Sequence, residues 1–176
     1  ALAFDAVFNS LWLSPGAQGK LYRRELAAGA GWELTSAGPP ARRVDVDPVS
    51  GGCWMATDSG IVRLDAAGNR DVILPELRVW DVSVNPVSGD CYYVGQSRLD
   101  GAWQAGRIFG WPNAQAEVIL DDAYDTLLRI QALPGPGATG FMIEQESAER
   151  TLRFDSAGIL MGRLDGYAFP LEFALE

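Results

Sequence analysis

Short apolar stretches alternate with polar, glycine-containing turns along most of the chain. In residues 44–47 two valines alternate with two aspartates, and a Pro-Val-Ser-Gly turn then leads into the apolar residues 53–57. A period of two is typical of a half-buried β-strand, and Gly and Pro mark the tight turns between strands. Two further short stretches, 61–64 and 72–74, follow after Gly-containing turns. This pattern predicts four strands joined by short turns, which make one antiparallel sheet.

The chain then repeats this pattern. Residues 82–93, VSVNPVSGDCYY, match residues 44–55, VDVDPVSGGCWM, and Cys53 and Cys91 lie 38 residues apart (91 − 53). Self-similarity with a period of ~40 residues, in units of short strands, is typical of the blades of a β-propeller. We therefore predict an all-β, propeller-like domain over residues 1–176, with about four four-stranded antiparallel blades.

Four repeat units cover most of the chain, at about 1–37, 38–76, 77–122 and 123–165. The other predicted strands are 4–8, 11–14, 20–25 and 32–35 in the first unit, 79–84, 91–95, 107–110 and 117–120 in the third, and 127–132, 140–144, 151–154 and 159–163 in the fourth. The corresponding aromatic residues are Trp12, Trp54, Tyr92 and Phe141. An α+β fold is the alternative, because residues 20–30 and 114–133 also suit a helix. The repeat register favours strands in both segments.

One more predicted strand, residues 167–176, follows the fourth unit. Its apolar residues alternate, and it is one strand too many for a ring of four complete blades. An unpaired apolar strand at a sheet edge invites pairing. We therefore expect it to pair with another chain or with a further part of a longer parent. The chain begins at Ala1 rather than Met, so we expect a processed mature chain, an excised piece or part of a longer protein.

Composition narrows the functions that this domain can have. The 14 basic and 23 acidic residues give a net charge of −9, so nucleic acid and anionic membranes are poor partners. No apolar run reaches the ~20 residues of a membrane-spanning helix. The chain contains no histidine, which removes Ser-His-Asp and Cys-His catalysis and His-ligated zinc. We predict that Cys53 and Cys91 are small buried residues rather than a disulfide, because equivalent positions of adjacent blades lie too far apart.

The repeats resemble a known family. Residues 53–69, CWMATDSGIVRLDAAGN, resemble the NHL-type propeller repeat, in which a W-V-A-D-like strand leads through a Gly turn to an R-hydrophobic-D strand. Residues 47–54, DPVSGGCW, and 85–93, NPVSGDCYY, more closely resemble the N-P-x-x-G-x-C-W repeats of bacterial surface-associated propellers. The resemblance covers residues 43–93 and implies the fold and an extracellular, periplasmic or cell-surface location. It does not imply one activity, since propellers include binding modules, lyases and lactonases.

The turns after strands two and four of each blade are expected to open on one face. The turn after the second strand of the third unit is predicted to be long, residues 96–106, and to carry Arg98 and Trp103. Trp and Arg are the residue types that anchor interfaces. We therefore predict that these two residues contact a partner or ligand, with Asp58 and Tyr124 on the same face. The alternative for Trp103 is that it folds back over a neighbouring blade.

Several other residues have candidate roles. Asp121, Asp122 and Asp125 could bind Ca²⁺ through carboxylate oxygens, and the alternative is a solvated acidic turn. The tryptophans Trp12, Trp54, Trp80 and Trp111 are predicted to pack between blades, and the pair Arg42–Arg43 is predicted to be solvated.

We predict a non-catalytic scaffold that binds a protein or ligand, or associates with itself, through blade-face loops or the C-terminal strand. The alternative is a His-free hydrolase or lyase with an acidic, Ca²⁺-assisted site in the central channel.

Overall fold

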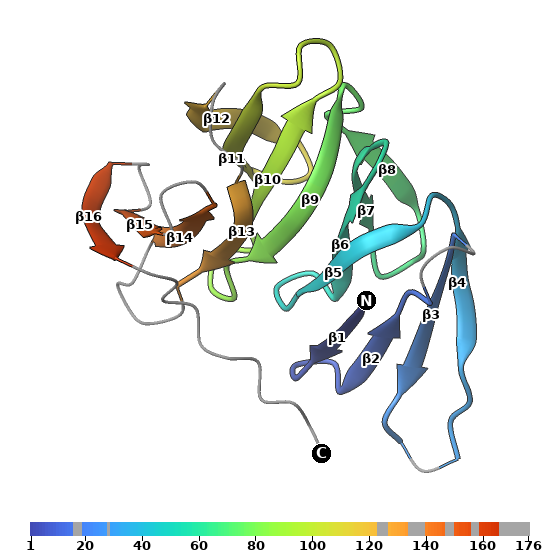
Figure 1. The fold of residues 1–176 in the computed structure, drawn as a ribbon. Helices are drawn as coiled ribbons and strands as arrows, with labels where there is room; N and C mark the ends of the chain where they lie inside the picture. The colour runs from blue at the N-terminus through green and yellow to red at the C-terminus, as the bar shows by residue number, and fades with distance from the viewer. Residues whose placement is uncertain are drawn as a thin grey trace.

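All regular structure in the described part of the chain is β-strand. The computed structural model describes residues 1–15, 19–27, 29–122, 127–133, 140–146, 150–155 and 159–165, which form four antiparallel sheets of four strands each (Figure 1). The predicted all-β architecture is confirmed. The two segments that also suited a helix contain strands instead, β3 in the first and β12 and β13 in the second.

Each sheet is a meander of four consecutive strands, and we call the sheets blades 1 to 4 in chain order. Blade 1 contains β1 (Leu2–Asp5), β2 (Ser10–Leu13), β3 (Lys20–Glu25) and β4 (Glu33–Ala37); blade 2 contains β5 (Ala41–Asp47), β6 (Gly52–Thr57), β7 (Gly60–Leu64) and β8 (Arg70–Ile73). Blade 3 contains β9 (Leu77–Val84), β10 (Cys91–Ser97), β11 (Trp103–Phe109) and β12 (Gln115–Asp122); blade 4 contains β13 (Leu127–Ala132), β14 (Gly140–Gln145), β15 (Arg150–Asp155) and β16 (Leu160–Asp165).

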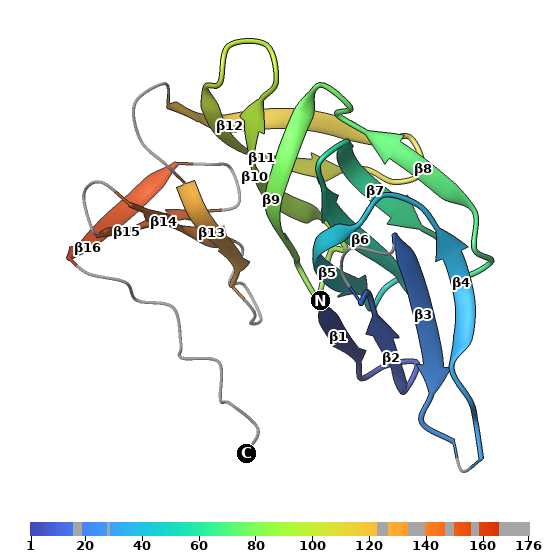
Figure 2. The same ribbon diagram turned by 45° about the vertical axis from the view of Figure 1, so that its right-hand side comes forward.

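The first strand of each blade is the innermost. Strand β5 lies between β1 and β9, and β9 lies between β5 and β13, while the later strands of each blade extend outward (Figures 1 and 2). The predicted surplus strand, 167–176, lies outside the described residues. No helix in the described part of the chain is long and apolar enough to cross a membrane.

Several predicted strand boundaries differ from the structure, and two of the differences have a clear local cause. Strand β1 ends at Asp5 rather than reaching Phe8, because the Asp5 carboxylate accepts hydrogen bonds from the backbone N–H groups of Val7 and Phe8 and closes a turn there. Strand β11 begins at Trp103 rather than at Arg107, because it pairs with β10 over the whole length from Gln96↔Trp103 to Cys91↔Ile108. The loop between β10 and β11 is therefore only residues 98–102.

β-Bulges in the innermost strands fix which residues are equivalent. The pairing skips one residue in each of β5, β9 and β13, and the skipped residues are Arg42, Trp80 and Leu128. Aligning the blades on these bulges makes Asp45, Ser83 and Gln131 equivalent. It also makes Phe141 equivalent to Cys53 and Cys91 rather than to Trp54. The predicted correspondence of the aromatic residues was therefore one residue out of register in blade 4.

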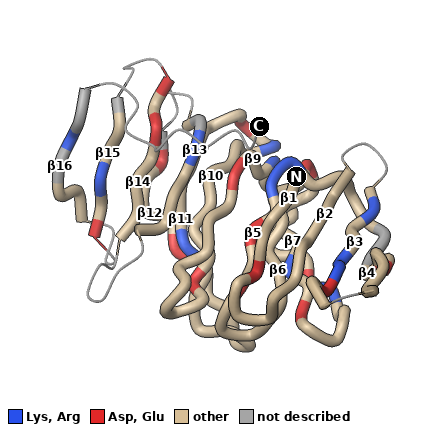
Figure 3. The backbone as a smooth tube through the Cα atoms, turned by 90° about the horizontal axis from the view of Figure 1, so that it is seen from below, with Lys and Arg blue, Asp and Glu red and all other residues tan. Residues whose placement is uncertain are grey.

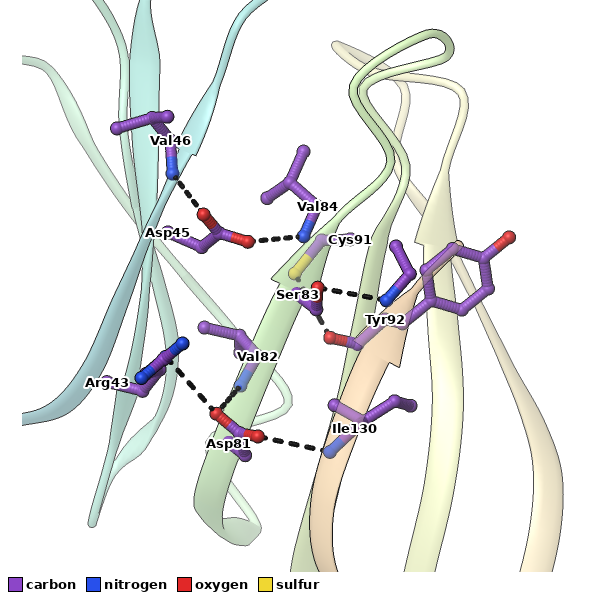
Figure 4. Close-up of polar contacts among 11 residues, drawn as sticks. Arg43, Asp45, Val46, Asp81, Val82, Ser83, Val84, Cys91, Tyr92 and Ile130 are labelled. Atoms are coloured by element: carbon purple, nitrogen blue, oxygen red, sulfur yellow. Dashed lines mark hydrogen bonds and ion pairs between the residues drawn. The ribbon is translucent and has the colours of Figure 1, made fainter. Parts of the chain in front are cut away.

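Polar side chains join the innermost strands of blades 2 and 3 to the blade that follows each of them. Asp45 accepts a hydrogen bond from Val84 N at 2.8 Å, and the equivalent Ser83 accepts one from Ala132 N at 3.0 Å (Figure 4). Asp81 adds a third link by accepting from Ile130 N at 3.0 Å. These N–H groups lie on the edge of the innermost strand that has no neighbouring strand. A buried N–H group needs a hydrogen-bond acceptor, and these side chains supply it.

Apolar residues fill the spaces between successive blades. One cluster joins blades 1 and 2 around Trp12 and Cys53, a second joins blades 2 and 3 around Trp54 and Cys91, and a third joins blades 3 and 4 around Tyr92. Both cysteines are free and fully buried, as predicted, and burial raises the pKa of each thiol. The hydrophobic core is therefore a series of layers between blades rather than one central cluster.

The link made by Asp81 predicts a pH dependence of stability. Burial raises the pKa of Asp81 to about 6, although the backbone hydrogen bonds and the nearby Arg43 and Arg129 oppose this rise. The folded protein therefore keeps a proton that the unfolded chain releases above its ordinary pKa. The free energy of unfolding should fall as the pH rises from about 4 to about 6, with Asp81 contributing up to about 3 kcal/mol.

Urea unfolding of the wild type and of Asp81→Asn across this pH range measures that contribution. The asparagine variant should lose this part of the slope while keeping one acceptor for Ile130 N. Asp58→Asn is the control. Because the pKa of Asp58 is lowered in the folded protein, Asp58 contributes stability that is lost as the pH falls, which is the opposite pH dependence to that of Asp81. Equal slopes in the wild type and Asp81→Asn would contradict the assignment.

Candidate binding surface

One end of blades 2 and 3 gathers arginine and tryptophan side chains. Because the strands of a blade alternate in direction, the start of the first strand and the turn after the second strand lie at the same end. The turn between β6 and β7 carries Asp58, and the loop between β10 and β11 carries Arg98. The bulges of β5 and β9 add Arg42 and Trp80 at this end. A bulge re-aims the side chain of its extra residue.

Three of these side chains, Asp58, Arg42 and Trp80, form a continuous row with Trp103 across the two blades. The Arg42 guanidinium bonds Asp58 at 2.6 Å and lies 4.0 Å from the centroid of the Trp80 ring. The Trp80 ring in turn lies 5.7 Å from the ring of Trp103 on β11. A cation–π contact contributes roughly 0.5–1 kcal/mol at an exposed site, and an aromatic pair a similar amount. The row is therefore held in place by its own contacts before any partner binds.

Three arginines, Arg42, Arg78 and Arg98, lie on this surface together with the acidic residues Asp58 and Asp100. Asp58 lies between two guanidiniums, because Arg78 Nε is 3.4 Å from the carboxylate that Arg42 bonds. The hydrogen bond from Arg42, followed by the charges of Arg42, Arg78 and Arg98, holds the pKa of Asp58 below its usual value. Asp58 is thus ionised at neutral pH and satisfied by the arginines. Figure 3 shows that basic and acidic positions occur on every blade, so this cluster is a local feature.

An open depression adjoins the row. Its volume is about 380 Å³, and its lining residues are Arg78, Gln96, Ser97, Arg98 and Gly101. The loop that forms one wall is held by backbone hydrogen bonds from Arg98 N to Glu76 O and from Gly101 N to Ser97 O, each 3.0 Å long. Gly101 has a φ of 79°, which a side chain would disfavour. The depression is therefore formed by an ordered loop, with two arginine side chains at its border.

The structure brings together three of the predicted site residues. Asp58 and Arg98 are exposed on this surface. Trp103 belongs to the same surface but was misplaced by the sequence, because it begins β11, packs on Trp80 and is half-buried against the core between blades 3 and 4. Its predicted role in binding stays a prediction. Tyr124 lies outside the described residues.

The predicted calcium ligands are only partly described. Asp121 is exposed on β12, and Asp122 is the last residue of that strand, but the side chain of Asp122 and all of Asp125 lie outside what the structure describes. Within the described residues, no three His, Cys, Asp or Glu side chains are grouped so that they could hold a metal ion. The calcium site therefore stays a prediction.

Sequence reasoning missed Arg42, Arg78 and Trp80. Arg42 was predicted to be solvated, and it instead pairs with Asp58 and stacks on Trp80. Trp80 was predicted to pack between blades, and it is 36% exposed. Arg42 and Trp80 lie 38 residues apart (80 − 42), so the repeat itself marks them as equivalent. The bulge that turns both side chains toward this surface has no signal in the sequence.

A second depression lies at the opposite end of the same two blades. It has a volume of about 180 Å³ and is lined by the turns after β5, β9 and β11, with Trp54 and Trp111 among its residues. Beside it, the buried Arg63 lies 3.9 Å from the Trp111 ring centroid and donates a hydrogen bond to Ser50 at 2.9 Å. Arg63 also pairs with Asp47 at 3.5 Å. These contacts join blades 2 and 3, so we assign this end a structural role.

Comparisons with known proteins show the fold. No protein-family model matches the chain, and no curated protein sequence matches it. Among solved structures, a streptogramin B lyase has a TM-score of 0.69 at 12% identity over 94% of this chain and 53% of its own. Regucalcin, a calcium-binding protein of Agrobacterium tumefaciens, has a TM-score of 0.62 at 17% identity over 94% and 57%. The nidogen–laminin complex gives 0.53 at 10% identity over 93% and 78%.

These structures are β-propellers, and the chain has the β-propeller fold. It spans about half the length of the first two. The similar proteins include both enzymes and binding proteins, so the fold alone does not decide between these functions.

The half-buried position of Trp103 predicts an intermediate effect on stability. Trp103→Ala should lower the free energy of unfolding by about 1–2 kcal/mol, between a surface change and the ~3–5 kcal/mol lost on truncating a buried tryptophan. Urea unfolding of Trp103→Ala beside Trp80→Ala and Trp12→Ala makes the comparison, since Trp80 is 36% exposed and Trp12 is 1% exposed. A loss for Trp103→Ala as large as that for Trp12→Ala would place it in the core and remove it from the binding surface.

Proposed function

We propose that the protein is a non-catalytic interaction scaffold that binds a protein partner through the surface formed by Arg42, Arg78, Trp80, Arg98 and Trp103. We call these five residues the Arg–Trp surface. The observation that carries the proposal is the row Asp58–Arg42–Trp80–Trp103, which crosses two blades at one end of the fold. Trp and Arg are the residues most enriched among those that dominate binding energy.

The chemistry of this surface selects the partner. Arg78 is 50% exposed, and Arg98 is also exposed, so each can offer a planar guanidinium to a carboxylate. The exposed part of Trp80 offers a flat apolar area beside them. We infer a partner segment that combines acidic and aromatic side chains. The net charge of −9 argues against a nucleic-acid partner.

The hydrogen bonds of the buried carboxylates support binding rather than catalysis. The pKa of Asp81, about 6, would suit a general acid. However, its Oδ1 accepts from Val82 N and its Oδ2 accepts from Ile130 N, so both oxygens are engaged in joining strands. Asp45 likewise accepts from Val46 N and Val84 N. We therefore assign these carboxylates to the structure of the blades.

Two expectations from the sequence remain part of the proposal. The resemblance to bacterial surface-associated repeats supports an extracellular, periplasmic or cell-surface location. Self-association through residues 167–176 is the other expectation, and a partner bound at the Arg–Trp surface does not depend on it.

Selection of peptides from a random display library on the immobilised protein tests the proposal. The selected peptides should share acidic and aromatic residues. Arg78→Ala and Trp80→Ala should each weaken their binding by about tenfold or more, which corresponds to about 1.4 kcal/mol. Fluorescence titration with one selected peptide should give the affinity of each variant.

Matched control variants distinguish binding at the Arg–Trp surface from nonspecific binding to exposed arginine and tryptophan side chains. Arg153 is an exposed arginine on β15 of blade 4, and Trp32 is 42% exposed beside blade 1. Arg153→Ala and Trp32→Ala should leave peptide binding unchanged. If they weaken peptide binding as much as Arg78→Ala and Trp80→Ala do, the peptide does not bind specifically at the Arg–Trp surface and the proposal is contradicted. A rise in Tm on adding Ca²⁺, together with turnover of a substrate, would favour the hydrolase or lyase alternative.

A further inference from the structure

The contacts that join blades 2 and 3 beside the second depression leave one carboxylate without a partner. Asp47 and Asp90 both line this depression. Both oxygens of Asp47 are engaged, Oδ1 by backbone N–H groups of its own turn and Oδ2 by Ser50 Oγ and Arg63 Nη2. The half-buried Asp90 carboxylate makes no hydrogen bond or ion pair within the described part of the chain. Removing a charge from water without a partner is unfavourable, so this carboxylate favours a positively charged ligand.

Three residues of this depression have no counterpart in the preceding blade. Asp90 comes directly before the repeated cysteine, where blade 2 has Gly52. Phe109 ends β11 and Trp111 lies in the turn that follows it, whereas the corresponding turn of blade 2, residues 65–69, contains no aromatic residue. Blade 2 forms the same four-stranded sheet without these side chains. The fold of a blade therefore does not require them, although all three line one depression.

The aromatic walls of the depression are held in place. The Trp111 ring is 36% exposed and meets the ring of the buried Trp54 edge-on, with 6.1 Å between the centroids. The Arg63 guanidinium lies 3.9 Å from the centroid of the Trp111 ring. An indole ring attracts a cation to its face, and this ring already binds the cation of Arg63 in this way. Phe109 is half-buried and lines the same depression.

The arginines near these walls are already paired. Arg63 pairs with Asp47 at 3.5 Å. Arg107, on the strand that leads into the aromatic wall, pairs with Glu117 at 2.7 Å. Among the described residues, none that lines the depression is basic. Asp90 therefore leaves one negative charge in excess at this place, in a protein whose net charge of −9 also attracts cations.

We propose that this depression binds an alkylated ammonium group, with Asp90 as its counter-charge and the Phe109 and Trp111 rings against its alkyl groups. A primary ammonium has three N–H donors to satisfy, and Asp90 is the one unengaged carboxylate among the described lining residues. A quaternary ammonium has no N–H group, and aromatic walls suit its methyl groups. The volume of about 180 Å³ is below the ~300–1,000 Å³ of pockets for drug-sized ligands, so the ligand group is small.

Titration of the wild-type protein with choline, followed by NMR, tests this proposal. The indole N–H signal of Trp111, assigned by its loss in Trp111→Leu, should shift and saturate at millimolar choline. The neutral alcohol in which carbon replaces the choline nitrogen has the same shape without the charge. This alcohol and ethanolamine, a primary ammonium, should each bind at least ~10-fold more weakly than choline.

Asp90→Asn removes the counter-charge and keeps the shape of the side chain. It should weaken choline binding by ~10-fold or more, and circular dichroism shows whether the blades are still folded. Equal affinity of choline for the wild type and Asp90→Asn would overturn the proposal. Equal affinities of the wild type for choline and the neutral alcohol, or for choline and ethanolamine, would also overturn it, as would the absence of saturable binding.

Two control variants and a second probe complete the test. Asp121 is exposed near the far end of β12, away from the Phe109↔Gln115 pair at the depression, so Asp121→Asn should leave choline binding unchanged. Trp80→Ala should also leave it unchanged, so failure of this site and failure of the Arg–Trp surface are distinguishable. The N-acetyl amide of trimethyllysine carries the same ammonium group on an amino-acid side chain. Its affinity relative to that of choline distinguishes a modified protein segment from a free small molecule as the source of the group.

Discussion

The structure depends on how the innermost strands satisfy their inner edges. Each of these strands pairs with only one neighbour in its own blade, so half of its N–H groups face away from any strand. Asp45, Ser83 and Asp81 supply acceptors for the N–H groups of Val84, Ala132 and Ile130. The acceptors must be short polar side chains on the preceding blade, and this requirement buries carboxylates and raises the pKa of Asp81. The same contacts join blade 2 to blade 3 and blade 3 to blade 4.

This arrangement also explains the position of the Arg–Trp surface, on which the proposed function depends. The bulges that aim Asp81 inward also leave Arg42 and Trp80 at one end of the blades, where they meet Asp58 and Trp103. The Arg–Trp surface therefore lies beside the junction between blades 2 and 3.

The sequence predicts the repeat and the number of blades because period-two alternation and Gly-containing turns are local properties. It places Asp58 and Arg98 at the same end of their blades for the same reason, and their role in binding stays a prediction. It fails where pairing between residues far apart in the sequence determines the bounds of a strand or the contacts of a side chain. Trp103 follows small and polar residues that suit a loop, yet pairing with Gln96 extends β11 to include it. The link from Asp45 is invisible in the repeat, because the equivalent residues are Ser83 and Gln131. Tyr124, Asp125 and residues 167–176 lie outside the described part of the chain.

Amide hydrogen exchange tests the role of the inner edges most directly. In the wild type, the N–H groups of Val84 and Ala132 should both be protected, although neither bonds a strand partner. Asp45→Ala should speed exchange at Val84 and leave Ala132 protected, and Ser83→Ala should do the reverse. Each variant removes only its own acceptor, so the two effects should be separate. Unchanged exchange at both amides, or an equal increase at both in either variant, would contradict the claim that these side chains join the blades.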